Sequence, residues 1–404
     1  MNVNTKKIIS DFKKIPDDIR NSKLLTADNF YIFAFLIFFI YNMLNTTMTY
    51  YLAQIRWNSP KVYCIVIVIL SLKMLLYDMS DIKLRKPLLV TYIVAMLSAF
   101  LLSYMDIIPV LIYIMFIIAA NGVDLRKLCV AVFSVSAFII SWITIRSQFG
   151  KIPDLVYDIT RHSFGFVYPT DYASHWVFAF LALFYYRKGI LKLYEIIFML
   201  ISAVSLLYFC QAKTSFLMIL AIVVLSMLFH KKQTKKIFDK SSDLFVVSPF
   251  AMATLTLVLT VLFGPFNYFF HIGSTFGSRL WINLKMIYKY GFSLMGRSLP
   301  DVGYGGSTAW PKDYTFIDNS YARIALHYGL VIFVIVMIYL TYIMVKSVKA
   351  KDYAMIAVMC VVLVHSISEH HLIDFSYNIF FFAGFAKLNE TIIGNPDRKT
   401  QLSQ

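Results

Sequence analysis

The sequence predicts an all-α polytopic membrane protein with about twelve transmembrane helices and two long extracytoplasmic loops. Hydrophobic residues make up 59% of the 404 positions and charged residues only 15%, with a mean hydropathy of +0.69. A soluble domain of this length carries far more charge, so the composition excludes an ordinary soluble enzyme. The apolar residues also fall in separate runs, most of them close to the roughly 20 residues that cross a bilayer.

Twelve apolar runs are expected to span the membrane. They cover residues 29–47, 61–78, 87–105, 107–121, 128–146, 172–187, 190–210, 213–230, 244–265, 320–345, 353–368 and 373–388. They form one transmembrane domain, 29–388, between an N-terminal tail, 1–28, and a C-terminal tail, 389–404. The N-terminal tail is charged and lacks the small-residue cleavage site of a signal peptide, which favours a cytoplasmic segment.

The net charge of +16 indicates basic loops on one side of a membrane rather than nucleic-acid binding. With the N-terminus inside, most Lys and Arg residues fall in inner segments, most densely in the KKQTKK run at 231–236. We therefore expect a multi-pass protein of the cytoplasmic membrane with both termini cytoplasmic. The two long loops, 147–171 and 266–319, then share the outer face, and long loops between closely spaced elements are usually functional or disordered.

Arginines and a carboxylate in the outer loops indicate the chemistry expected there. Arg161 lies in the first loop, Arg279 and Arg297 lie in the second, and Asp318 is near its end. A guanidinium matches phosphate oxygens with parallel hydrogen bonds and neutralises a pyrophosphate leaving group. A nearby carboxylate accepts the proton of an attacking hydroxyl. The pattern predicts glycosyl transfer from a lipid-pyrophosphate donor, with no metal, cofactor or nucleotide.

Further polar residues near the same loops are candidate substrate-binding groups. They are Arg297, Asn319, Tyr321, Arg323, His327, Asp171 and Glu369. Several have a plainer interpretation. Asp318 and Asn319 also make an ordinary helix N-cap, and Arg323 and His327, one turn apart, could equally reach the membrane interface.

A cluster of ionisable residues lies between the last two expected spans. It consists of His365, Glu369, His370, His371 and Asp374. No pair of histidines has i,i+4 spacing, so we expect no metal site. Ionisable residues at membrane depth are functional candidates by default, which favours Glu369 as a cavity residue, with Lys213 a weaker candidate. The sequence also lacks a Walker A loop, a Rossmann glycine fingerprint, HExxH and CxxC.

Several short segments follow one another in a characteristic order. They are Gly165-Phe166-Val167-Tyr168-Pro169, Ser278-Arg279-Leu280-Trp281, the glycine-rich turn 296–306, and Asp318-Asn319-Ser320-Tyr321 with Gly329-Leu330. This order resembles the O-antigen polymerase (Wzy) and O-antigen ligase superfamily of bacterial membrane glycosyltransferases. Asp318 stands where that family often has His, which favours a polymerase over a ligase, and Thr170 stands where it has Asn.

The resemblance implies a GT-C-type fold and a metal-independent, inverting glycosyltransferase. The donor would be a polysaccharide on undecaprenyl pyrophosphate, and the acceptor a single lipid-linked repeat unit of a capsule, exopolysaccharide or O-antigen. Arg161 and Arg279 would bind the pyrophosphate, backed by Arg297, and Asp318 would act as base or orient the acceptor. Partners would be these lipid-linked glycans and the flippase and chain-length regulator of the pathway, not nucleic acid.

Two alternatives remain open. A lipid-linked oligosaccharide flippase or transporter would place arginines in a central cavity reached from both leaflets, whereas here the candidate charges lie in outer loops. An O-antigen-ligase-type transferase would use the same residues but pass the glycan to a different acceptor.

Overall fold

The computed structural model describes residues 26–49, 59–78, 107–270, 275–309, 311–391 and 393, and most of them are helical. Two short strands, β1 (Val156–Tyr157) and β2 (Arg161–His162), pair antiparallel in the one sheet of the described chain. The expected all-α membrane architecture is confirmed at this coarse level, because several of the helices are long and apolar.

The helices of the first half are α2 (Ala27–Asn45), α4 (Ser59–Lys73), the π-helix η1 (Met74–Asp78), α6 (Ile107–Ala119), α7 (Leu125–Gln148), α8 (Pro169–Tyr186) and α9 (Leu193–Cys210). Those of the second half are α10 (Lys213–Phe229), α11 (Lys232–Lys240), α12 (Ser242–Phe270), α13 (Thr275–Tyr290), α14 (Ser320–Arg323), the π-helix η2 (Ile324–Tyr328), α15 (Gly329–Lys349), α16 (Tyr353–His365) and the 3-10 helix η3 (Ile379–Gly384).

Side chains that satisfy free backbone amides mark several helix starts. Thr26 accepts a hydrogen bond from the amide of Asn29 at 3.2 Å before α2, and Asp124 accepts one from Arg126 at 3.0 Å before α7. Pro169 opens α8, at a position where no amide donor is needed. Apolar runs then continue these helices.

Five of the described helical segments are long and apolar enough to cross a membrane. They are α2, α7, α9, the Ser242–Phe263 part of α12, and the continuous run Ser320–Lys349. Helices α10 and α11 meet at a bend of 110° and make a sixth candidate if counted as one span. The expected span 87–105 and most of both tails lie outside the described residues.

The expectation of a transmembrane helix at 373–388 is wrong. In this stretch the structure has the six-residue helix η3, which is too short to cross a bilayer. Asp374 accepts hydrogen bonds from the amide and hydroxyl of Ser376 at 2.9 and 2.7 Å, and Asn378 accepts one from the amide of Phe380. Such local bonds compete with helical ones, so a high average hydropathy conceals a turn here.

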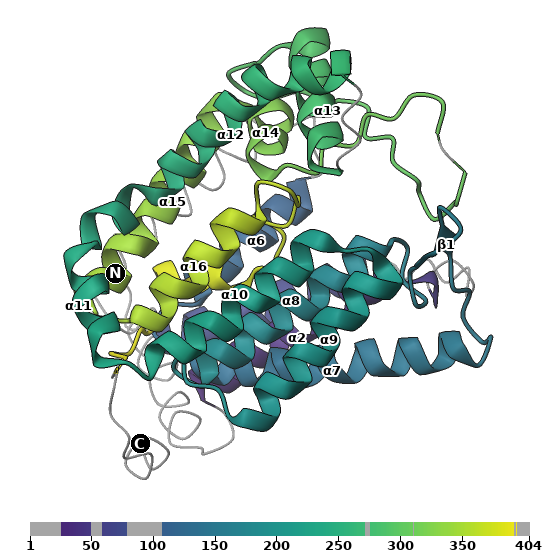
Figure 1. The fold of residues 1–404 in the computed structure, drawn as a ribbon. Coiled ribbons are helices and arrows are strands. Elements are labelled where there is room, and N and C mark those ends of the chain that lie inside the picture. Colours follow the sequence, from purple (N-terminus) through teal and green to yellow (C-terminus); the bar gives the residue numbers. More distant parts are fainter. Residues whose placement is uncertain are drawn as a thin grey trace, which may run out of the picture.

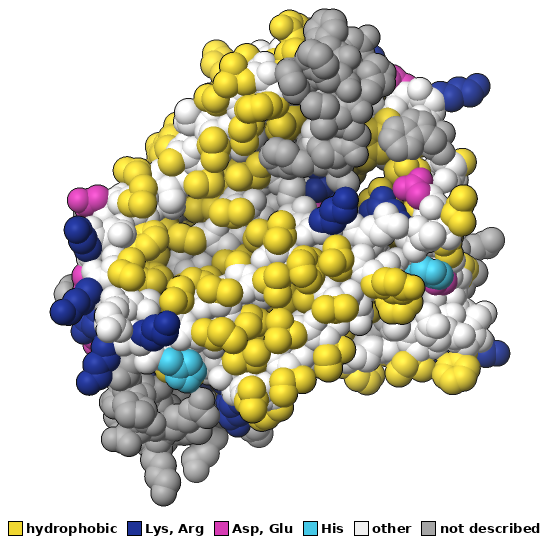
Figure 2. All heavy atoms as spheres, viewed as in Figure 1, with side chains coloured by type: hydrophobic (Ala, Val, Ile, Leu, Met, Phe, Trp, Pro, Cys, Tyr) yellow, Lys and Arg dark blue, Asp and Glu magenta, His cyan; other side chains and the backbone are white. Residues whose placement is uncertain are grey.

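Figure 1 shows the long helices in two groups, α12 with α15 and α7 with α8, α9 and α10. Helix α16 contacts members of both groups. Helix α8 is buried along almost its whole length, which explains why the part that follows His175 is apolar on every side. Helices α9 and α12 expose many large apolar side chains, as a lipid-facing surface requires. Figure 2 shows apolar side chains across this face and Lys and Arg at the end that carries α11.

The connecting segments gather at two ends of the molecule (Figure 1). At one end, Tyr353 at the start of α16 donates to Asp239 of α11 at 2.6 Å, and both belong to segments expected near the inner face. At the other end, the ring of Tyr304 lies 5.0 Å from Tyr157 and 5.3 Å from Tyr168. The two long loops, expected on one face, are therefore in contact with each other.

A close backbone approach explains the glycine at the start of α15. Gly329 has a φ of +89°, and a Cβ there would lie 2.2 Å from the amide nitrogen of Gly296 and 2.5 Å from the carbonyl oxygen of Leu294. The amide of Leu330 donates to Ser293 in the same loop at 2.9 Å. Because other residues have a Cβ, only glycine fits this contact between helix and loop.

Candidate active site

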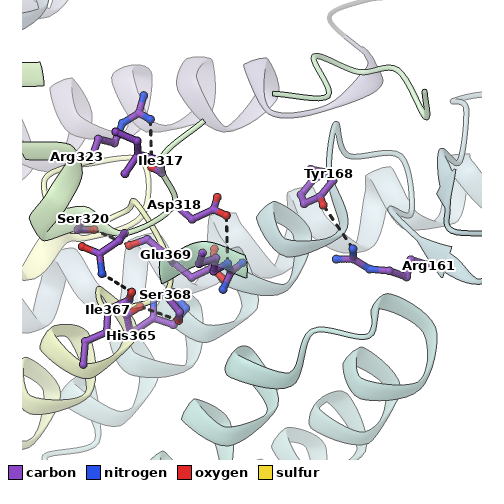
Figure 3. A network of polar contacts seen from close by, with 12 residues as sticks. Arg161, Tyr168, Ile317, Asp318, Ser320, Arg323, His365, Ile367, Ser368 and Glu369 are labelled. Atoms are coloured by element: carbon purple, nitrogen blue, oxygen red, sulfur yellow. Dashed lines mark hydrogen bonds and ion pairs between the residues drawn. The ribbon is translucent and has the colours of Figure 1, made fainter. Parts of the chain in front are cut away.

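A buried ion-pair cluster joins three segments that are far apart in the sequence. Arg279 of α13 donates from Nε to Asp318 Oδ2 at 3.1 Å and from Nη2 to Glu369 Oε1 at 3.0 Å. Asp318 precedes α14 and Glu369 follows α16, and the three side chains are 9%, 17% and 2% exposed respectively. Figure 3 shows that the carboxylates of Asp318 and Glu369 both point toward one guanidinium group. The structure thus brings together three of the residues expected in the site.

Two carboxylates share one guanidinium in this cluster. Burial raises the pKa of Glu369 to about 7, against the opposing effect of Arg279, and burial also raises the pKa of Asp318. Burial lowers the pKa of Arg279, but the two carboxylates together outweigh it, and the net pKa is above the ordinary value. The guanidinium stays charged while a carboxyl group can hold or release a proton near neutral pH, as a general acid or base must.

The residue after Asp318 takes the role of helix cap. Asn319 accepts a hydrogen bond from the amide of Ala322 at 2.8 Å, and its side-chain amide donates to the carbonyl of Ile367. These bonds fix the start of α14 to the loop after α16. The side chain of Asp318 is therefore not needed as a cap and faces the guanidinium instead.

On one side of the cluster lies a cavity of about 370 Å³, here named the basic pocket. Its cationic side chains are Arg161, Lys213 and Arg279. Its apolar wall, from α10, α12 and α16, consists of Leu217, Met218, Leu259 and Val364. Figure 2 shows Lys and Arg side chains in a hollow of the otherwise largely apolar face. The pocket thus combines positive charge with an apolar wall.

Arg161, in β2, is held at the edge of the basic pocket. Its Nε donates to the carbonyl of Cys210 at 3.2 Å. Its Nη1 donates to the hydroxyl of Tyr168 at 3.4 Å, as Figure 3 shows. Its ion pair with Asp158, at 3.7 Å, involves a carboxylate that is 68% exposed. Water screens such a pair, so the charge of Arg161 remains effective toward a bound anion.

On the other side of the cluster lies a second cavity, about 310 Å³, here named the aromatic pocket. Its rings are Tyr168, Tyr304, Tyr314 and Phe316, and its ionisable side chains are Asp171, Asp301, Asp318 and His370. The rings of Tyr168 and Tyr304 are stacked, with centroids 5.3 Å apart. Aromatic faces accept the apolar face of a sugar ring, and carboxylates accept hydrogen bonds from its hydroxyls. Thr170 lines both pockets.

Two of the expected arginines line neither pocket. Arg297 donates from Nη1 to the carbonyl of Tyr290 at 2.7 Å. Arg323 pairs with Asp301 and lies 4.7 Å from the centre of the Phe316 ring. Both guanidinium groups hold parts of the second loop in place, and a role for them in substrate binding stays a prediction.

Tyr321, His327 and Asn319 also lie outside the two pockets. The hydroxyl of Tyr321 donates to the carbonyl of Leu363 at 2.8 Å, which joins α14 to α16. His327 is buried in η2. These residues support the site from behind, whereas Asp171, Glu369 and the weaker candidate Lys213 line the pockets.

Three aromatic residues of the aromatic pocket, Tyr304, Tyr314 and Phe316, are not among the residues expected from the sequence. Tyr304 stands between Gly303 and Gly305. A ring between two glycines in a turn is readily presented to a ligand, and this local pattern is the signal that points to it. The sequence carries no comparable signal for the other two.

Two sets of side chains have ligand atoms within 4.8 Å of one another, close enough to share a metal ion after small adjustments. One set is Asp318, Glu369 and His370, and the other is Asp171, His370 and His371. In the first set, both carboxylates already bind the guanidinium of Arg279. The expectation of no metal came from spacing along one segment, which cannot detect donors that meet from different segments.

No protein-family model, no curated protein and no solved structure matches this chain. The chemistry of the site follows from its geometry and charge.

Proposed function

We propose that the protein is a polysaccharide polymerase of the O-antigen polymerase (Wzy) type, a metal-independent inverting glycosyltransferase with a GT-C-like fold of several membrane spans. It joins undecaprenyl-pyrophosphate-linked repeat units at the outer face of the cytoplasmic membrane. The observation that carries this proposal is the position of Arg279, which stands with Asp318 and Glu369 between a basic and an aromatic pocket.

The basic pocket suits the pyrophosphate of a polyprenyl-linked donor. Arg161, Lys213 and Arg279 supply positive charge and hydrogen-bond donors for phosphate oxygens. Helix α10 begins at the pocket, and no side chain caps its start. The amide of Lys213 donates to the carbonyl of Gln211 at 3.1 Å, which leaves the amides of Thr214 and Ser215 to bind an anion. The apolar wall matches the prenyl chain, and Leu217 on it is 56% exposed at the lipid-facing surface.

The aromatic pocket suits the acceptor sugar, and Asp318 lies within its reach. The acceptor hydroxyl attacks the anomeric carbon of the donor and forms the new glycosidic bond, while its proton passes to Asp318. The bond from the anomeric carbon to the pyrophosphate oxygen breaks, and that oxygen keeps the electron pair. Arg161 and Arg279 neutralise the charge that develops on it. Attack from the side opposite the leaving group inverts the anomeric centre.

The distribution of basic residues supports the proposed orientation. Helix α11, with the sequence KQTKKIFDK, lies at the end of the molecule away from β1 and α13 (Figure 1). Basic segments remain in the cytoplasm, so the pockets open at the outer face and both termini lie inside. On that face the protein receives repeat units from a flippase, and a chain-length regulator is a further partner.

The test is the glycan made by cells in which this protein is the sole polymerase and carries Arg279→Ala at matched protein level. We expect long polymer to disappear and single lipid-linked repeat units to accumulate on the outer leaflet. The matched control is Lys285→Ala, on the same helix, because Lys285 pairs with the exposed Asp313 and lines neither pocket. Arg279→Lys keeps the charge and is expected to retain part of the activity.

Other outcomes identify other functions. Repeat units that accumulate only on the inner leaflet indicate a flippase. A normal polymer that is no longer attached to its final acceptor indicates an O-antigen-ligase-type transferase. Unchanged glycan in the Arg279→Ala cells removes Arg279 from the active site and refutes the proposal.

A further inference from the structure

Two histidines that the proposed transfer does not use lie at the aromatic pocket, where His370 lines the cavity and His371 is buried beside it. The ring of His371 stacks on Tyr377, with 3.7 Å between centroids, and lies 4.1 Å from the ring of His370. His371 is 1% exposed, and among the described residues neither of its ring nitrogens has a hydrogen-bond partner. The Nδ1 atom of His370 also lacks one. Buried nitrogens without partners cost free energy, so they require an explanation.

A carboxylate from another part of the chain approaches these histidines. Asp171 lies in the first turn of α8 and lines the aromatic pocket together with His370. Ligand atoms of Asp171, His370 and His371 lie within 4.8 Å of one another. Ligands that bind one zinc ion at about 2.0–2.2 Å are about 4 Å apart at most, so small side-chain rotations complete the set.

The neighbouring set of Asp318, Glu369 and His370 is less suited to a cation. The guanidinium of Arg279 lies 3.0–3.1 Å from both of its carboxylates and carries the positive charge that an ion would bring. A second cation at that position meets electrostatic repulsion. Asp171, in contrast, has no ion pair among the described residues. Burial raises the pKa of its carboxyl group to about 8, and a bound metal ion takes the place of the proton.

We propose that Asp171, His370 and His371 form a binding site for one divalent transition-metal ion of the zinc class, with an open coordination position toward the aromatic pocket. Two imidazoles and one carboxylate favour zinc over magnesium or calcium, which prefer oxygen ligands. The ion gives one ring nitrogen of each imidazole a partner and offsets negative charge in a pocket that also contains Asp301 and Asp318. No step of the glycosyl transfer is assigned to the ion.

The open position follows from the number of ligands. Zinc in proteins is most often four-coordinate, and three protein ligands leave one position for water or another oxygen. Because Asp171 and His370 line the aromatic pocket, that position is reached from it. A hydroxyl of a bound glycan is one oxygen that can occupy it.

The test is metal binding by the full-length protein, purified in detergent with a histidine-free affinity tag and stripped with EDTA. After Zn²⁺ is added and the excess removed, elemental analysis is expected to give one tightly bound Zn²⁺ per chain. Zn²⁺ is also expected to raise the Tm, because a ligand that binds the folded state stabilises it. Both readouts are independent of glycosyl transfer.

Variants separate this site from other histidines. Asp171→Asn and His371→Phe, of which the second keeps an aromatic ring against Tyr377, are each expected to weaken Zn²⁺ binding by about 10–100-fold or more. The control is His365→Phe, since the ring nitrogens of His365 are also buried without hydrogen-bond partners among the described residues, but His365 lies outside the ligand set. Wild-type protein that retains no Zn²⁺, or equal weakening in the control and in folded ligand variants, overturns the proposal.

Discussion

Replacing Asp318 by Asn tests the carboxylate that faces both the cluster and the aromatic pocket. The amide has nearly the same size as the carboxylate and keeps an oxygen that can accept a hydrogen bond from Arg279 Nε, which lies 3.1 Å from Asp318 Oδ2 in the wild type. The guanidinium also keeps Glu369, 3.0 Å from Nη2. The amide cannot accept the proton of an attacking hydroxyl, so catalysis should be lost while the fold remains.

The size of the expected loss in kcat follows from the loss of the general base. A positioned general base contributes about 10²–10⁴-fold to a rate, or about 3–5 kcal/mol. Stranding a buried charge costs about 3–5 kcal/mol of stability, but Glu369 still neutralises Arg279 in Asp318→Asn, so the stability should change far less. We expect kcat to fall by two to four orders of magnitude while the Tm and the KM of the donor change little.

The assay is polymer formation by purified variants in proteoliposomes supplied with lipid-linked repeat units, with the Tm measured on the same samples. Asp313→Asn is the matched control, because Asp313 is an exposed carboxylate of the same loop that pairs with Lys285 and lines neither pocket. The control should keep a rate near that of the wild type. Wild-type kcat in Asp318→Asn, or activity lost only in proportion to unfolded protein, would refute the assignment of Asp318 as the base.

Two further predictions concern the pH dependence of stability and the packing of the glycine-rich turn. The pKa of Glu369 is raised to about 7 from an ordinary 4.5, so the stability of the folded protein falls as the pH rises between these values. Glu369→Gln should therefore have a higher Tm than the wild type at pH 8 and the same Tm near pH 5. A difference in Tm between variant and wild type that is equal at the two pH values contradicts this. Gly329→Ala should destabilise the protein in two ways, through the cost of a positive φ and through a backbone clash of about 1–3 kcal/mol. Gly305→Ala is the control, because it also has a positive φ but nothing lies within 4 Å of the added Cβ. Equal losses of Tm in the two variants would show that the clash is relieved.

Local sequence was sufficient to place most of the helices, because hydropathy and length are properties of a single segment. The runs 29–47, 128–146 and 190–210 correspond to α2, α7 and α9 within a few residues. It was not sufficient at 373–388, where the hydrogen bonds of Asp374 and Asn378 to their neighbours stop a helix. The end of the expected span 213–230, in contrast, agrees with the structure, since α10 ends at Phe229 and the chain then bends by 110° into α11.

For the candidate site, the sequence identified charged residues but not the groups with which they pair. Arg279 and Arg297 both lie in the second loop, and the sequence favoured Arg279 for the pyrophosphate. In the structure Arg279 joins the carboxylate cluster, whereas Arg297 bonds to the carbonyl of Tyr290. A sequence indicates that a buried charge needs compensation, but tertiary contacts decide which group supplies it. The pairing of Asp171 with histidines from the loop after α16 was hidden for the same reason.

The most direct test supplies purified protein in liposomes with undecaprenyl-pyrophosphate-linked repeat units and no other enzyme. We expect a ladder of lengthening glycans, with one undecaprenyl pyrophosphate released for each new glycosidic bond, from the wild type and from Lys285→Ala but not from Arg279→Ala. Wild-type protein that leaves the repeat units unchanged under conditions where it stays folded, or that moves them across the bilayer without joining them, would contradict the proposed polymerase.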